Sequence, residues 1–98
     1  MDEVEKLAEM FKALSDPTRL RLVKLLGESR GALCVNALAH MLGVTQSAVS
    51  QHLRVLRQAG LVRSERCGQF VHYSLDEGGL EQYKARLREM LGDDFVVV

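Results

Sequence analysis

The sequence predicts a mostly helical α+β fold with one β-hairpin, in the order α-α-α-α-β-β-α. Apolar residues recur at helical spacing in four segments before residue 59 and again near the C-terminus, whereas alternation typical of strands occurs only within 61–75. A chain of 98 residues makes a single small domain, 1–98. Because so small a domain buries only about 60% of its unfolded surface, a deep catalytic cleft is disfavoured and a self-associating binding module is favoured.

Capping residues delimit the first two helices. Residues 3–14 form an amphipathic helix, and the Ser-Asp-Pro sequence that follows ends it. Asp16 is a suitable N-cap for the next helix, and Pro17 suits its first position. That second helix is expected to run from Pro17 to about Leu26, with Gly27 as its C-cap.

A helix-turn-helix is predicted over residues 36–58. Two helical segments are joined by a turn at Gly43, and Thr45 is a good N-cap for the second one. The outer face of this second helix is polar, and its side chains can contact phosphates or base edges. The candidate DNA-binding residues here are Thr45, Gln46, Ser47, Ser50, Gln51, Arg54 and Arg57, with His52 expected either to face DNA or to pack.

The hairpin at 61–75 would be the wing of a winged helix-turn-helix. Arg66 and Gln69 lie near its tip, where they could contact phosphates or the minor groove. The alternative is a hairpin that only covers the core. A formal net charge of zero conceals a basic middle, since residues 43–74 hold four arginines and one acid. This distribution is typical of a surface that faces a polyanion, although charges can also cluster by chance.

The terminal helices, 3–14 and 79–91, are predicted to form a homodimer. Each carries more apolar surface than the winged core needs, and pairing them across a twofold axis would hold two recognition helices about 34 Å apart. The alternative is that both helices pack only on their own core. The expected interface residues are Leu7, Phe11, Leu80, Tyr83, Leu87 and Met90.

The two cysteines, Cys34 and Cys67, form no disulfide framework and favour a reducing cytoplasm. The acidic N-terminus argues against a signal peptide, and the lack of a long apolar run argues against a membrane partner. Cys34 has three interpretations: a small buried residue, a redox-reactive thiol, or a metal ligand completed by acids of a partner subunit such as Glu3 or Glu5. Cys67 would be exposed on the wing and open to oxidation; whether the two thiols could be bridged depends on geometry.

Three segments resemble one known family. Residues 44–62 (VTQSAVSQHLRVLRQAGLV) are similar to the recognition-helix signature of the ArsR/SmtB winged-helix repressors, 13–22 (ALSDPTRLRL) to the entry of their second helix, and 72–75 (HYSL) to the end of their wing. The resemblance covers nearly the whole chain. It implies a homodimer that binds operator DNA, represses transcription and leaves the DNA when an inducer, often a metal ion, binds.

The metal sites of that family are incompletely matched. Where metal-sensing members commonly carry ELCVCDL, this chain has ALCVNAL at 32–38, so Cys34 matches but Asn36 replaces the second thiol. A single thiolate is a poor anchor for a soft metal. The family's other site uses Asp and His in the last helix, but no His follows position 72. No cofactor is therefore expected to be required, and a metal inducer could act only through Cys34.

Three classes of function compete. An enzyme is disfavoured because no phosphate loop, nucleophile elbow or metal-binding His pair is present. A winged helix used for protein–protein assembly would be indicated by acids on the recognition helix, and there are none between Thr45 and Gln58. The prediction is a sequence-specific repressor, with a thiol-sensing or inducer-independent regulator as the alternative mechanism.

Overall fold

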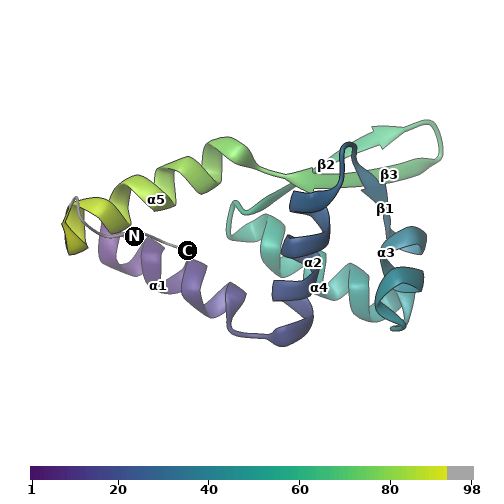
Figure 1. Cartoon of the computed structure of the whole chain (residues 1–98), viewed down its shortest axis with the longest axis horizontal. Helices are drawn as coiled ribbons and strands as arrows, with labels where there is room; N and C mark the ends of the chain where they lie inside the picture. Colours follow the sequence, from purple (N-terminus) through teal and green to yellow (C-terminus); the bar gives the residue numbers. More distant parts are fainter. Residues whose placement is uncertain (93–98) are drawn as a thin grey trace.

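The computed structural model describes residues 1–92, and the apolar tail Phe95–Val98, which the sequence analysis left unassigned, lies outside them. A helical body and a β-hairpin form one end of the molecule, and the first and last helices extend together from the other (Figure 1). The elements are α1 (Glu3–Leu14), α2 (Pro17–Glu28), β1 (Leu33–Cys34), α3 (Val35–Leu42), α4 (Gln46–Gln58), β2 (Val62–Cys67), β3 (Phe70–Leu75) and α5 (Glu77–Leu91). The predicted α+β class and the order of its helices and hairpin are confirmed.

Side-chain caps fix where the helices begin. Asp16 accepts a hydrogen bond from the backbone N–H of Arg19 at 3.1 Å, with Pro17 as the first residue of α2. The prediction that Gly27 caps α2 was wrong. The helix continues to Glu28 and its C-cap is Ser29, whose N–H bonds to the carbonyl of Leu25. Gly27, now within the helix, lies close to the hairpin, since a β-carbon there would be 3.4 Å from Leu75.

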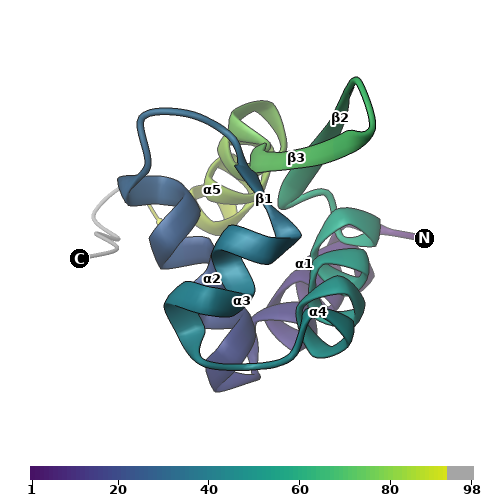
Figure 2. The same cartoon turned by 90° about the vertical axis from the view of Figure 1, so that its right-hand side faces the viewer.

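The sheet has three antiparallel strands in the order β1-β3-β2. In the hairpin, Val62 pairs with Leu75 at the base and Cys67 with Phe70 at the tip. Figure 2 shows this hairpin extending away from the helices. The strand β1 was not predicted, because its two residues are too few to show an alternating pattern. It places Cys34 opposite His72 on β3.

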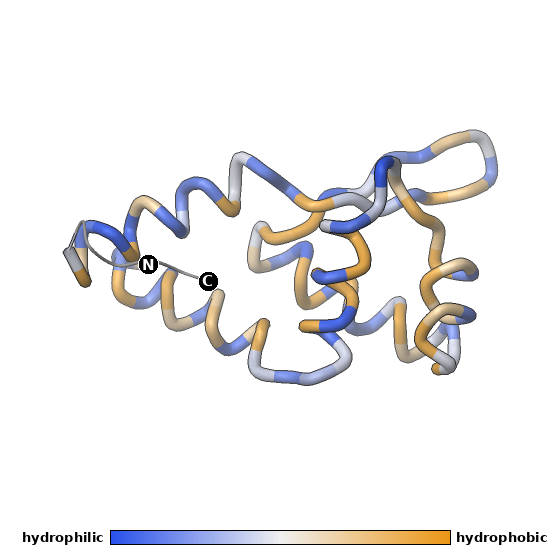
Figure 3. Tube along the Cα trace, viewed as in Figure 1, coloured by the Kyte–Doolittle hydropathy of each residue, from blue (hydrophilic) through white to orange (hydrophobic). Residues whose placement is uncertain are grey.

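A single hydrophobic core joins all five helices. Its centre is fully buried and consists of leucines and valines from α2, α3, α4, β2 and the turn before β2, namely Leu22, Leu38, Val49, Leu53, Leu56, Leu61 and Val62. Figure 3 shows hydrophobic and hydrophilic positions interspersed along the helices, as the amphipathic patterns require. Across residues 1–92, every helix falls short of the length and apolarity that a bilayer span demands.

The start of α5 is fixed to the turn that follows α4. The N–H of Asp76 donates to the carbonyl of Leu61 at 2.9 Å, and the hydroxyl of Tyr83 donates to the carbonyl of Ala59. Gly79 approaches this turn so closely that a β-carbon there would collide with the carbonyl oxygen of Gly60. Three contacts therefore set the position of α5 relative to α4. The helix begins at Glu77, two residues before the predicted start at residue 79.

Two leucines on α2 test this description of the core. Leu22→Ala should lower the free energy of unfolding by about 2–5 kcal/mol, because Leu22 is fully buried and its removal leaves a cavity. Leu20→Ala is the matched control, since Leu20 is 51% exposed on the same helix and its replacement should cost less than about 1 kcal/mol. Urea denaturation measures both; equal losses would contradict the assignment of the core face of α2.

Candidate nucleic-acid interface

Helix α4 has one buried and one exposed face. Val49, Leu53 and Leu56 are completely buried against the other helices. The polar side chains predicted to contact DNA are all exposed: Thr45, Gln46, Ser47, Ser50, Gln51, Arg54 and Arg57. The helix therefore presents a continuous polar surface that the core does not use.

The turn that precedes α4 orients this surface. Gly43 adopts the left-handed conformation, with φ of +67°, that glycine tolerates best. The N–H of Val44 then bonds to the carbonyl of Ala39 at 3.1 Å, which closes the end of α3. Because Ala39 is small and almost fully buried, α3 and α4 can approach closely, and α4 leaves the turn along the surface of the body.

The N-terminus of α4 suits an anion. The hydroxyl oxygen of Thr45 accepts a hydrogen bond from the N–H of Ala48 at 3.1 Å, which confirms the predicted cap. The first turn contains no acidic residue, so nothing there offsets the positive end of the helix dipole. A phosphate oxygen placed at this end would meet a partial positive charge and exposed hydroxyl groups.

Arg57 connects the recognition helix to the wing. Its guanidinium donates a hydrogen bond to the hydroxyl of Ser64 on β2 at 3.0 Å, and the side chain remains exposed. A guanidinium has five donors, so this bond leaves others available for a phosphate. Arg57 was predicted from the sequence to contact DNA, but this bond was not predicted, because the pairing depends on how the hairpin lies against α4.

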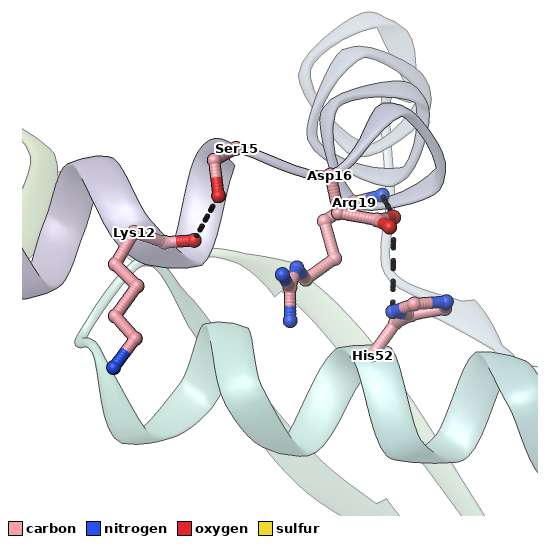
Figure 4. Close-up of polar contacts among 5 residues, drawn as sticks. All are labelled: Lys12, Ser15, Asp16, Arg19 and His52. Carbon is pink, nitrogen blue, oxygen red and sulfur yellow. Dashed lines mark hydrogen bonds and ion pairs between the residues drawn. The ribbon is translucent and has the colours of Figure 1, made fainter.

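His52 lies apart from the polar face. Its ring is only partly exposed, and Nδ1 lies 3.9 Å from the carboxylate of Asp16 at the start of α2 (Figure 4). The hydrogen bond from the N–H of Arg19 lowers the pKa of the Asp16 carboxyl, and the nearby imidazole lowers that pKa further. Of the two roles expected for His52, facing DNA or packing, this geometry matches the contact between helices.

The wing tip lies near the first turn of α4. Arg66 and Gln69 are exposed, as are their neighbours Cys67 and Phe70. A shallow hollow of about 240 Å³ lies between the two elements, and Gln46 from α4 and Gln69 from the wing both line it. The structure thus brings together two polar residues that are far apart in sequence and were predicted separately to contact DNA.

Cys34 lines the same hollow, which the sequence analysis did not anticipate. Both cysteines are free thiols, so the bridge left open by the sequence is absent. His72, a residue type that can bind metal, lies opposite Cys34 in the sheet. Within residues 1–92, no group of three or more His, Cys, Asp or Glu is arranged to hold a metal ion. The side chains of one protomer therefore do not fit the soft-metal site that the resemblance implies.

The terminal helices leave apolar side chains exposed. Phe11 on α1 and Met90 on α5 are about half exposed, and Val4, one heptad before Phe11, is 66% exposed. Leu7 and Leu87 are instead buried within the protomer, so they have almost no surface left to lose in a dimer. Leu80 and Tyr83 are half-buried. Of the residues predicted to form the dimer interface, Phe11 and Met90 are therefore the most exposed in the protomer, and Leu80 and Tyr83 keep part of their surface; Val4, which was not among them, is also exposed.

Comparison with known proteins gives consistent results. Residues 16–64 match the sequence model of "Bacterial regulatory protein, arsR family". The "Transcriptional repressor SmtB homolog" of Synechocystis sp. is 48% identical over 75 residues, which are 76% of this chain and 55% of that protein. This chain thus spans little more than half the length of that relative.

Two solved structures share the fold. The "ArsR-like Transcriptional Regulator from Rhodococcus sp. RHA1" superposes with a TM-score of 0.77 at 33% identity, covering 93% of this chain and 83% of that one. A Mycobacterium bovis fragment, described as a homodimeric winged helix-turn-helix DNA-binding domain, has a TM-score of 0.72 at 26% identity, covering 96% and 84%. The exposed polar face of α4 and the wing agree with these matches. The chain belongs to the ArsR family of bacterial regulatory proteins and has the winged helix-turn-helix fold.

Proposed function

We propose that this protein is a homodimeric, sequence-specific DNA-binding repressor that acts in the cytoplasm and is not an enzyme. One observation carries the proposal: α4 buries Val49, Leu53 and Leu56 and exposes a polar face without acids on its other side. A helix of this kind fits the major groove, where Gln51 can pair with adenine and Arg54 with guanine. Arg66 and Gln69 of the wing would contact the phosphate backbone or the minor groove.

The charge distribution supports a polyanionic partner. Residues 43–74, which hold the turn, α4 and the wing, contain four arginines and only Glu65 as an acid. Each phosphate that these arginines neutralise would release counterions from DNA. The affinity for DNA should therefore fall steeply as the salt concentration rises.

The exposed apolar residues of α1 and α5 support a homodimer. Phe11 and Met90 lie on the two helices that extend away from the helix-turn-helix (Figure 1). Pairing these helices with a second copy would remove this surface from water and present two α4 helices to one side of a DNA duplex.

A thiol-sensing regulator is the alternative mechanism, and the position of Cys34 favours it. Cys34 shares a hollow with Gln46 and Gln69, so oxidation there would add polar bulk between two residues proposed to contact DNA. Cys67 is exposed at the wing tip and could act similarly. A metal inducer bound only by one protomer's Cys34 is not proposed, because residues 1–92 offer no group of three metal-binding side chains.

Substitutions on α4 test the DNA-binding face. Gln51→Ala and Arg54→Ala should each weaken operator binding by about 1–3 kcal/mol at fixed salt, because each removes a contact to a base edge. Arg88→Ala is the control, since it removes the same charge from the exposed surface of α5 and should leave the affinity unchanged. Gel-shift titrations with upstream DNA of the protein's own gene measure this; equal effects of Arg54→Ala and Arg88→Ala would argue against the α4 face.

Two exposed phenylalanines test the dimer. Phe11→Glu should shift the protein from dimer to monomer in sedimentation experiments, because it places a charge in the proposed apolar interface. Phe70→Glu is the matched control: Phe70 is 52% exposed and Phe11 51%, but Phe70 lies on the wing. A Phe11→Glu variant that stays dimeric would disprove the assignment of α1.

Cysteine variants distinguish a thiol-sensing regulator from a repressor whose DNA binding does not depend on its thiols. Under the thiol-sensing alternative, peroxide should weaken DNA binding of the unaltered protein and not of Cys34→Ser, with Cys67→Ser as the comparison. The same gel-shift assay, repeated with and without peroxide, measures the response. If all three proteins respond equally to peroxide, neither thiol acts as a sensor.

A further inference from the structure

A cavity of about 560 Å³ lies at the C-terminal end of α4. It is bounded by α1, the last turn of α4 and the first half of α5, with Arg19 of α2 contributing from one side. Its volume lies within the range of about 300–1,000 Å³ that is typical of small-molecule sites. None of the residues proposed to contact DNA lines this cavity.

The lining is positively charged. Lys6, Lys12, Arg19 and Arg86 line the cavity, and Glu9 is the one acid among its lining residues. Arg86 is paired with Glu3, whereas within residues 1–92 the other three cations make no ion pair. Several uncompensated cations around one cavity produce a positive potential that attracts anions.

Arg19 is the residue that points most directly to a ligand. Its Nε atom is buried and has no hydrogen-bond partner, the only such side-chain atom among the described residues. A buried donor without an acceptor is costly to a folded protein. Figure 4 shows the guanidinium extending from α2 towards α4, on the same side as Lys12. An oxygen acceptor in the cavity would satisfy this donor with a charge-assisted bond.

The remainder of the lining is suited to an apolar group. Ala13, Val55, Ala59 and the ring of Tyr83 lie around the cavity. Tyr83 is held in place by the hydrogen bond from its hydroxyl to the carbonyl of Ala59. A ligand that combined an anionic group with a flat or branched apolar part could therefore use both halves of the lining.

We infer that this cavity binds a small organic anion, whose carboxylate or phosphate group is held by Arg19 in the field of Lys6 and Lys12. The apolar part of the ligand packs against Val55 and Tyr83. Because Ala59 and Gly60 at the end of α4 line the cavity, the ligand lies against the turn that fixes α5 to the recognition helix.

An NMR titration of the full chain tests the inference with three probes: benzoate, the neutral benzyl alcohol, and inorganic phosphate. Benzoate should produce saturable shifts of the backbone amide signals of Gly60 and Gly79, which line the cavity. Benzyl alcohol, which lacks the charge, should bind more weakly. Phosphate should also bind more weakly, because it lacks the apolar part. Phosphate binding as tight as that of benzoate would overturn the assignment to an organic anion.

Matched variants test whether Arg19 holds the carboxylate of the ligand. Arg19→Gln should weaken benzoate binding at least about tenfold, because it removes the charge-assisted bond. Arg21→Gln removes the same charge from the same helix, but Arg21 is exposed and outside the lining, so binding should be unchanged. Lys12→Gln provides a second test at an exposed position where folding is not at risk, and it should also weaken binding.

Two further results would refute the inference. One is the absence of saturable benzoate shifts at millimolar concentration, which is expected if the second protomer fills the cavity. The other is equal benzoate binding by Arg19→Gln, Lys12→Gln and Arg21→Gln. The titration contains no DNA, so its outcome is independent of whether the α4 face binds an operator.

Discussion

The burial of one face of α4 is the constraint on which the rest of the structure depends. Val49, Leu53 and Leu56 are fully enclosed by the surrounding helices, and rotating α4 about its axis would expose them to water. Burying three such side chains contributes several kcal/mol, on the order of 1.5–3 each. This fixes the rotation of the helix, and the polar face with Gln51 and Arg54 is exposed as a consequence. The exposure of the proposed DNA-binding surface therefore follows from the packing of the core.

The contacts at the end of α4 extend this constraint to the terminal helices. Asp76, Gly79 and Tyr83 all meet the short turn between α4 and β2, so the start of α5 cannot shift without disturbing that turn. The helix proposed to dimerise is thus held in a fixed relation to the helix proposed to bind DNA. The cation-lined cavity lies at this same junction, where a bound anion would contact both helices.

Much of the fold could be predicted from the sequence because its signals are local. Helical spacing of apolar residues and the caps Asp16 and Thr45 marked helices that the structure places within one or two residues of the expected limits. The strand β1 could not be predicted, since two residues carry no period and the strand exists only through pairing with β3. The end of α2 was misplaced at Gly27 because the preference of glycine for helix ends is only a tendency, and this helix continues to Glu28 with Ser29 as its C-cap.

The candidate site could likewise be predicted from the sequence only in part. Exposure of the polar face follows from its spacing within α4, whereas the position of Cys34 near Gln46 and Gln69 depends on contacts between distant segments. His52 shares the recognition segment with Gln51, yet its ring lies 3.9 Å from the carboxylate of Asp16 on another segment, a proximity that the sequence does not reveal. Periodicity also could not separate the apolar residues of α1 that serve the protomer core, such as Leu7, from those that remain exposed, such as Phe11.

Dimethyl sulfate interference on operator DNA tests the central claim most directly, because methylation of guanine N7 blocks contacts in the major groove. If two copies of α4 enter the major groove, interfering guanines should form two clusters separated by about one helical turn, ~10 base pairs. Interference at a single cluster would contradict the dimeric arrangement. Binding that is unaffected by methylation anywhere in the protected region would contradict insertion of α4 into the major groove.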